Sequence, residues 1–321
     1  MTSLPLRVGV IGCGAFGRNH ARIYHQLPEA ELVGVYDLDP QVTAAVAQEF
    51  GARAYPTASA LAAAVQAVSV AVPTAAHRAT VIPLLEAGID VLVEKPIAAC
   101  LDDADAMIAA ATSRQRILQV GHLERFNPAV TLIRPRVTQP LFFEVHRLSV
   151  FTPRSLDVDV LLDLMIHDLD VVLSLVRAPI QEMHAVGLPV LSSKVDIANI
   201  RVSFVGGCVA NFTASRVSTE RVRKLRFFQP GEYISLDYTR QDAHVFALQR
   251  QASGVRVAQD HLTAPPAEPL QLELRAFLRS VADRTPPEVG GAEAQAALRA
   301  AIQAAAAIAD HARLIGLPSN S

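Results

Sequence analysis

The chain has 321 residues, 51% hydrophobic and 19% charged, and 29 Lys+Arg against 31 Asp+Glu leave a net charge of −2. This composition excludes a disordered chain, and the near-neutral charge argues against nucleic acid or a membrane surface as a partner. Three widely separated cysteines form neither a disulfide framework nor a metal site, which favours the cytoplasm. No stretch is typical of a membrane span or a signal peptide.

The first part of the chain alternates short apolar runs with helix-like segments. We expect buried strands at 6–11, 32–36, 67–72, 90–93 and 117–120. We expect helices at 15–26, 42–50, 61–65, 77–87 and 101–113. Strict alternation with continuously apolar strands predicts a parallel sheet covered on both faces, a Rossmann-type α/β domain over residues 1–123.

After Gly121 the hydrophobic pattern changes to a period of two. Runs of this kind at 141–150 and 183–238, separated by Gly-Gly and Pro-Gly turns, predict a large open sheet that is mainly antiparallel. The segment 252–269 fits either a loop or an edge strand.

Helices complete this second part of the chain. An apolar helix is expected over 160–173, and the Ala-rich tail at 269–312 is expected to be helical with a break at Pro286. We therefore predict an α+β domain for substrate binding and oligomerisation over 124–321. The sequence leaves open whether the C-terminal helices pack back on the first domain.

A glycine-rich motif lies between the first strand and the first helix. Its residues are Gly12, Cys13, Gly14, Ala15, Phe16 and Gly17, which match G-x-G-x-x-G. In this setting the glycines permit a tight turn and close approach of a pyrophosphate to a helix N-terminus. Asp37 ends the second strand, where a carboxylate accepts ribose hydroxyls and disfavours a 2′-phosphate, so NAD is expected rather than NADP. Asp39 is a competitor for this role, and the alternative is a structural turn with a solvated acid.

A lysine follows the strand at 90–93, in the sequence Glu94-Lys95-Pro96. The carboxyl end of a strand in an open parallel sheet is where ligands bind, and a lysine there can act on a substrate hydroxyl. Spacing alone supports equally well a surface lysine at a strand–helix turn.

At this point the chain resembles the glucose-fructose oxidoreductase/inositol dehydrogenase (Gfo/Idh/MocA) family. The matching segments are GCGAFG at 12–17, AVPTAAH at 71–77, AGIDVLVEKPIA at 87–98 and DLMIHDLD at 163–170. The resemblance implies nicotinamide-dependent oxidation or reduction of sugars and cyclitols, Lys95 as the catalytic lysine, and Asp163 and His167 in the substrate pocket. Further cofactor contacts are expected from Val72, Pro73, His77, Glu94, Lys95 and His122.

Asp163 and His167 are four residues apart and share one face of a helix. A histidine titrates near neutrality and can take the hydroxyl proton, while Lys95 stabilises the developing alkoxide. Which of His167 and Lys95 is the base stays open, and without the resemblance an exposed helix face is the simpler interpretation. We expect the neighbouring Asp168 and Asp170 to face solvent or to cap the helix.

Two features suggest the substrate. The junction GHLERFNPA resembles that of family members acting on UDP-N-acetylglucosamine at C3, in some bacteria for lipid A, so we expect substrate contacts from Arg125 and Asn127. The alternative is a helix start. Arginines suit a diphosphate, and the candidates are Arg154 and the basic cluster Arg216, Arg221, Arg223, Lys224 and Arg226. The alternative is a solvated hairpin face.

The sequence thus predicts a cytoplasmic, NAD-dependent UDP-N-acetylglucosamine 3-dehydrogenase with no metal. A rival of the same class is an inositol or free-sugar dehydrogenase. A rival of another class is a non-catalytic, cofactor-binding regulatory protein, which the intact Lys95, Asp163 and His167 disfavour. Apolar residues on both faces of the open sheet, such as Phe227 and Phe228, predict a homodimer or homotetramer.

Overall fold

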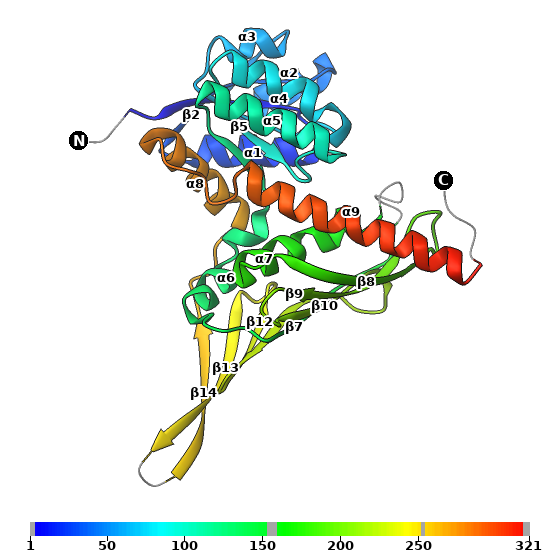
Figure 1. Ribbon diagram of the computed structural model, residues 1–321. Coiled ribbons are helices and arrows are strands. Elements are labelled where there is room, and N and C mark those ends of the chain that lie inside the picture. The colour runs from blue at the N-terminus through cyan, green and yellow to red at the C-terminus, as the bar shows by residue number, and fades with distance from the viewer. Residues whose placement is uncertain (1–3, 153–158, 252–253, 317–321) are drawn as a thin grey trace. The chain divides into compact units, whose positions relative to one another are not determined.

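The computed structural model describes residues 4–152, 159–251 and 254–316, and its contacts divide the chain into two units (Figure 1). The first unit is Met1–Leu123 with Glu268–Gln295, and the second is Glu124–Ala267 with Ala296–Ser321. The first tail helix therefore belongs to the first unit, while most of the last helix belongs to the second. In the parts that the structure describes, no helix is long and apolar enough to cross a membrane.

The first unit is built on a six-stranded, all-parallel sheet in the order β3-β2-β1-β4-β5-β6. Its strands are β1 (Leu6–Ile11), β2 (Ala30–Tyr36), β3 (Arg53–Ala54), β4 (Ala67–Val70), β5 (Asp90–Glu94) and β6 (Leu118–Gly121). Its helices are α1 (Ala15–Gln26), α2 (Pro40–Glu49), α3 (Ala58–Ala62), α4 (His77–Glu86), α5 (Leu101–Arg114) and α8 (Pro269–Asp283). The predicted parallel α/β sheet is confirmed. The pattern missed β3, because two exposed residues carry no periodicity.

The core of this unit is continuous with the tail helix α8. Leu274 and Phe277 of α8 are fully buried and belong to the same apolar cluster as Val8, Val10 and Tyr24. The hydroxyl of Tyr24, on α1, lies 2.8 Å from Ser69 Oγ on β4, which satisfies both buried polar groups.

The second unit is built on an eight-stranded sheet in the order β14-β13-β12-β11-β7-β10-β9-β8. Its strands are β7 (Phe142–Val150), β8 (Ile180–Leu188), β9 (Ile197–Phe204), β10 (Val209–Ser218), β11 (Val222–Gln229), β12 (Glu232–Asp237), β13 (Asp242–Gln251) and β14 (Gly254–Thr263). All neighbours pair antiparallel except β7 and β10, which are parallel, so the predicted mainly antiparallel sheet is confirmed. β7, the first of these strands in the chain, lies between β10 and β11. Residues 254–263 form β14 at one edge of the sheet, and β8 forms the other edge.

Helices cover one face of this sheet (Figure 1). They are α6 (Pro128–Ile133), a π-helical turn at Leu161–Met165 that continues into α7 (Ile166–Val176), and the later part of α9 (Gly291–Leu314). The strands alternate as predicted, so Phe143 and Phe227 lie in the core. On the opposite face Phe142, Phe228, Tyr233 and Phe246 form an aromatic row with ring centroids 4.9–5.7 Å apart.

Candidate functional site

The glycine-rich loop between β1 and α1 requires glycine at two positions for steric reasons. Gly12 has φ +87°, and a Cβ there would lie 2.5 Å from the carbonyl oxygen of Ala71. A Cβ on Gly17 would lie 1.7 Å from the carbonyl oxygen of Gly12. At Gly14 a Cβ would meet nothing within 4 Å, so the backbone there borders open space. The loop therefore lets another molecule approach the backbone before α1.

A cavity of about 1190 Å³ lies beside this loop, within the first unit. Among the residues predicted to bind the cofactor, those that line it are Gly12, Gly14, Ala15, Phe16, Asp37, Val72 and Pro73. These residues come from the carboxyl ends of β1, β2 and β4, which is where an open parallel sheet binds nucleotides. The volume of the cavity and the glycine backbone beside it fit a dinucleotide.

Asp37 and Asp39, the two acids considered for the ribose, have different surroundings. Asp37 lines the cavity, and its Oδ2 accepts the N–H of Cys13 at 2.6 Å, while its Oδ1 accepts the N–H of Asp39 at 3.0 Å. Asp39 caps α2, because its Oδ1 accepts the N–H of Gln41 at 2.8 Å. Asp37 is thus the acid of this pair that lines the cavity, and it also holds the glycine-rich loop.

The Cys13 thiol lies inside this loop and is buried. Burial, followed by the negative charge of Asp37, raises the pKa of Cys13 to about 12. The thiol is therefore protonated at neutral pH.

Besides Cys13 and Gly17 of the loop, three residues predicted to contact the cofactor are buried and do not line the cavity: His77, Glu94 and His122. The ring of His77 lies against backbone carbonyls, with Nε2 3.0 Å from the oxygen of Val72 and Nδ1 3.1 Å from that of Ile97. Burial lowers the pKa of His77. His77 therefore joins the segment after β4 to the segment after Lys95.

The three candidate catalytic residues are divided between the units. Lys95 follows β5 in the first unit and is half-buried, with a cis peptide bond to Pro96. Asp163 and His167 are half-buried in the second unit, one in the π-helical turn and the other in the first turn of α7.

The two junction residues predicted to bind substrate, Arg125 and Asn127, have hydrogen-bond partners inside the second unit. Arg125, 7% exposed, pairs with Asp170 through Nε–Oδ2 at 2.8 Å and Nη2–Oδ1 at 3.3 Å. Asn127 donates to Glu124 Oε2 at 3.1 Å and to the Tyr238 carbonyl at 3.0 Å. Both side chains therefore have polar partners within this unit, and Arg125 is joined to α7 through Asp170.

A second buried arginine, Arg147, was missed in the sequence. It donates to Asp168 through Nε at 2.6 Å and Nη2 at 2.9 Å, and to Glu124 through Nη1 at 3.0 Å. Burial raises the pKa of Asp168, and the charge of Arg147 opposes that effect. The available signal was the alternation along β7, which places Arg147 on the same inward face as Phe143.

The prediction that Asp168 and Asp170 face solvent or cap the helix is wrong. They are 2% and 1% exposed and pair with Arg147 and Arg125. Because these acids follow His167 by one and three residues, the two ion pairs anchor the helical turn next to it.

Three residues of the predicted basic cluster have different surroundings in the second unit. Arg226 pairs with Glu144 at 3.0 Å, Arg223 lies opposite Arg147 in the sheet, and Arg216 is buried against Asp196. Arg154, the remaining diphosphate candidate, lies outside the described residues.

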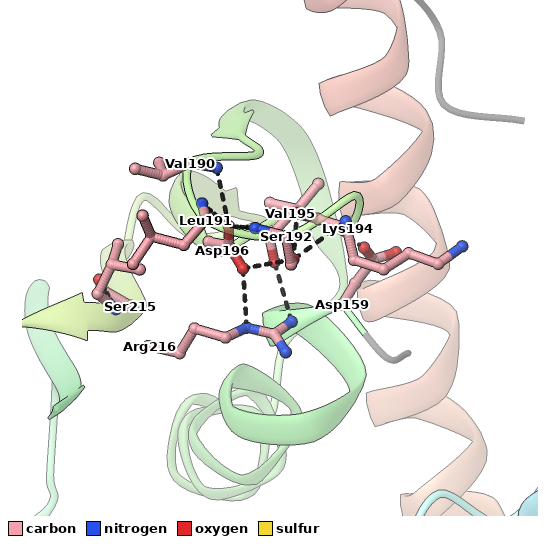
Figure 2. A network of polar contacts seen from close by, with 10 residues as sticks. Asp159, Val190, Leu191, Ser192, Lys194, Val195, Asp196, Ser215 and Arg216 are labelled. Carbon is pink, nitrogen blue, oxygen red and sulfur yellow. Dashed lines mark hydrogen bonds and ion pairs between the residues drawn. The ribbon is translucent and has the colours of Figure 1, made fainter. Parts of the chain in front are cut away.

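Asp196 organises the loop between β8 and β9 (Figure 2). Its Oδ2 accepts the N–H groups of Val190, Leu191 and Ser192 at 2.7–2.8 Å, and its Oδ1 lies 3.3 Å from Arg216 Nε. Despite burial, which acts in the opposite direction, hydrogen bonds from Ser192 and the loop N–H groups lower the pKa of Asp196 to about 2.

This loop also reaches the start of the helix that carries Asp163. The N–H of Val195 donates to Asp159 Oδ1 at 2.8 Å, and the N–H of Val160 donates to the Val195 carbonyl at 3.1 Å. The Asp196 network therefore holds the residues immediately before the π-helical turn.

Within the described ranges, one group of side chains has ligand atoms close enough for a metal ion. Asp242, His244 and His261 lie on β13 and β14 with these atoms within 4.8 Å of one another. The Nε of Arg240 lies 3.3 Å from Oδ1 of Asp242, and the rings of His244 and His261 stack with their centroids 4.3 Å apart. These contacts already account for the cluster.

Comparison with known proteins gives consistent results over the chain. A profile described as an oxidoreductase family with an NAD-binding Rossmann fold matches residues 6–122. The UDP-N-acetylglucosamine 3-dehydrogenase of Acidithiobacillus ferrooxidans is 37% identical over 95% of this chain and 98% of its own. A solved structure of that enzyme superimposes with a TM-score of 0.90 at 36% identity, covering 95% and 98% of the two chains. An inositol 2-dehydrogenase of Rubrobacter xylanophilus is 30% identical over 66% of this chain and 65% of its own.

Proposed function

Since this chain belongs to the oxidoreductase family of glucose-fructose oxidoreductase and inositol dehydrogenase, we propose that it oxidises C3 of UDP-N-acetylglucosamine to the 3-keto sugar. The observation that carries the proposal is the full-length likeness to the Acidithiobacillus enzyme, at 37% identity over 95% of the chain. The inositol 2-dehydrogenase of Rubrobacter xylanophilus matches 66% of the chain, which makes cyclitols the second candidate substrates.

The proposed chemistry uses Lys95, Asp163 and His167. When bound, the nicotinamide supplies the acceptor for the hydride that leaves the ring carbon. Lys95 donates a hydrogen bond to the oxygen that becomes the carbonyl, and Asp163 orients the sugar or the imidazole. His167 accepts the hydroxyl proton in this scheme, because an imidazole titrates near neutral pH. Lys95 as the base is the alternative.

For the cofactor we propose NAD rather than NADP. Asp37 lines the cavity with a carboxylate that is kept in place by the N–H groups of Cys13 and Asp39. Such a carboxylate accepts hydrogen bonds from ribose hydroxyls and repels a 2′-phosphate. The glycine-rich loop and the N-terminus of α1 provide the site for the pyrophosphate.

The decisive assay measures the absorbance of reduced nicotinamide. The purified chain is incubated with UDP-N-acetylglucosamine, UDP-glucose, free N-acetylglucosamine and myo-inositol, each with NAD and with NADP. A coupled aminotransferase removes the keto product, so an equilibrium that favours the alcohol does not hide turnover. We expect turnover with UDP-N-acetylglucosamine and NAD, and turnover about 10²- to 10⁴-fold slower with Lys95→Met.

Other outcomes of this assay select the alternatives. Turnover with myo-inositol and none with UDP-sugars would replace the nucleotide-sugar substrate by a cyclitol. NADH binding without turnover of any substrate would favour the non-catalytic, regulatory protein.

We also propose that the protein is cytoplasmic and that its keto product is the substrate of an aminotransferase, as in the synthesis of 3-amino sugars for lipid A. A further proposal is that the protein forms a homodimer or homotetramer. The aromatic row of Phe142, Phe228, Tyr233 and Phe246 supports assembly, because it leaves apolar surface on the sheet face opposite the core. Light scattering on the native chain and on Phe228→Glu tests this, with a shift toward the monomer expected for the variant.

A further inference from the structure

A buried histidine contacts the end of β5, the strand that immediately precedes Lys95. His20 is on α1 and has no exposed surface, and its Nε2 lies 2.9 Å from Oε1 of Glu94 at the end of β5. Among the described residues its Nδ1 meets no hydrogen-bond partner. The contact with Glu94 is therefore the polar interaction that the structure gives this ring.

The Glu94 carboxylate is held from several sides. Its other oxygen, Oε2, accepts the backbone N–H of Lys95 at 3.2 Å. A Cβ on Gly121 of the neighbouring strand β6 would lie 3.0 Å from the same oxygen, so the carboxylate packs directly on that backbone. Glu94 is 8% exposed, so its carboxylate is held mainly by these protein contacts and little by water.

We propose that His20 is a positioning residue for Lys95: by holding the Glu94 carboxylate, it fixes the backbone from which the lysine extends. The inference rests on the proposed role of Lys95. The contact also connects two parts of the first unit. The helix α1 begins at the glycine-rich loop, and His20 joins it to the end of β5, which Lys95 follows. The glycine-rich loop and the backbone of Lys95 are then both held in place by α1.

The charge of Glu94 also acts on its neighbours. The ionisable groups that interact with it are Lys95 beside it, His20 on α1 and His77 on α4, and β6 contributes the backbone of Gly121. Against the effect of burial, the hydrogen bond from His20 and the charges of His20 and Lys95 lower the pKa of Glu94. An ionised Glu94 stabilises the protonated form of Lys95.

The first experiment compares His20→Leu with His20→Gln in the full chain. Gln can place a donor near the position of Nε2, whereas Leu cannot. We expect His20→Leu to lower kcat about 10- to 100-fold, with KM for NAD and the Kd for NADH within about 3-fold of the native chain. His20→Gln should recover most of kcat.

The matched control is Tyr24→Phe, four residues later on α1. It removes an equally buried hydrogen bond, to Ser69 on β4, and so tests whether loosening α1 is enough to lower kcat. We expect native kcat for Tyr24→Phe. An equal loss of kcat in Tyr24→Phe and His20→Leu, or native kcat in His20→Leu, would overturn the proposal.

A second readout does not need turnover. The chain has three lysines, Lys95, Lys194 and Lys224, so competitive acetylation followed by mass spectrometry reports each amine separately. Glu94→Gln removes a negative charge beside Lys95, so Lys95 should become reactive at lower pH while Lys194 and Lys224 keep their profiles. His20→Leu should change the pH dependence of Lys95 acetylation, and His20→Gln should restore the pH dependence of the native chain.

The two readouts separate this inference from the proposed function. Failure of all substrates to turn over would refute the proposed function, and the acetylation profiles would still decide the role of His20. Turnover of UDP-N-acetylglucosamine with an unchanged Lys95 profile and unchanged kcat in His20→Leu would leave the function standing and refute the role of His20.

Discussion

Arg125 and Asp170 form a two-point ion pair in the interior of the second unit, with Nε–Oδ2 at 2.8 Å and Nη2–Oδ1 at 3.3 Å. Asp170 lies three residues after His167 on α7, so this pair anchors the turn next to the candidate base. The pair of Arg147 and Asp168 acts in the same way on the residue that directly follows His167. A junction segment that resembles a substrate-recognition signature thus packs against the helix that carries the candidate base.

Arg125→Ala should destabilise the protein strongly. It leaves the Asp170 carboxylate buried without its guanidinium, a change that costs about 3–5 kcal/mol in the free energy of unfolding, measured by urea titration. The paired replacement Arg125→Met with Asp170→Leu should recover much of this loss. Arg226→Ala, which breaks the more exposed pair with Glu144, is the control and should cost at most about 1 kcal/mol. Native stability of Arg125→Ala together with a raised KM for UDP-N-acetylglucosamine would instead make Arg125 a substrate contact.

Asp196 should make stability dependent on acid pH. Its folded-state pKa of about 2 lies below the ordinary value of 3.8, so its contribution is fully present above about pH 5 and is lost as pH falls toward 2. This contribution is at most about 2 kcal/mol. Asp196→Asn should lower the free energy of unfolding at neutral pH and flatten its decline between about pH 5 and 2. The exposed Asp260→Asn should follow the native curve, and a parallel decline in Asp196→Asn would contradict the assignment.

Lys95→Met and His167→Asn should each lower kcat by about 10²- to 10⁴-fold while the affinity for NADH changes little. The pH dependence of kcat/KM then identifies the base. In the native chain a group that must be deprotonated gives a rising limb with pH, and the variant that lacks the base loses that limb. Retention of the limb in His167→Asn would transfer the role of base to Lys95.

Asp37→Ala should reduce the preference for NAD over NADP. Loss of hydrogen bonds to a charged carboxylate corresponds to a roughly 10-fold or greater rise in the Kd for NAD, while the Kd for NADP should fall. Asp39→Ala is the matched control, because it removes the cap of α2 and should cost about 1 kcal/mol of stability with the cofactor preference intact. Fluorescence titration with both reduced cofactors measures this, and a shifted preference in Asp39→Ala alone would assign the ribose to Asp39.

The three cysteines should react at very different rates with iodoacetamide. Cys100 is exposed, whereas Cys13 and Cys208 are buried. Burial and Asp37 raise the pKa of Cys13 to about 12, and burial raises that of Cys208 to about 11, so few thiolates form at neutral pH. Peptide mass spectrometry of the native chain should find Cys100 modified first. Equal rates for Cys13 and Cys100 would show that the glycine-rich loop opens freely.

The amino-acid sequence by itself determined the features that depend on neighbours along the chain. The glycine-rich loop, α1 at 15–26 and the position of Lys95 after β5 follow from apolar runs and from glycine sterics within short windows. The alternation in the second unit likewise predicted a mainly antiparallel sheet with one buried face, as β7 and β11 show.

Only the tertiary structure decided the partners of the buried charges. Arg125 and Asp170 are 45 residues apart, and Arg147 meets Asp168 only because β7 lies in the sheet beneath α7. A charged residue in a sequence is most simply interpreted as solvated, because burying it without a partner is costly. Whether such a partner exists depends on strand order and helix packing, which no short window of sequence contains.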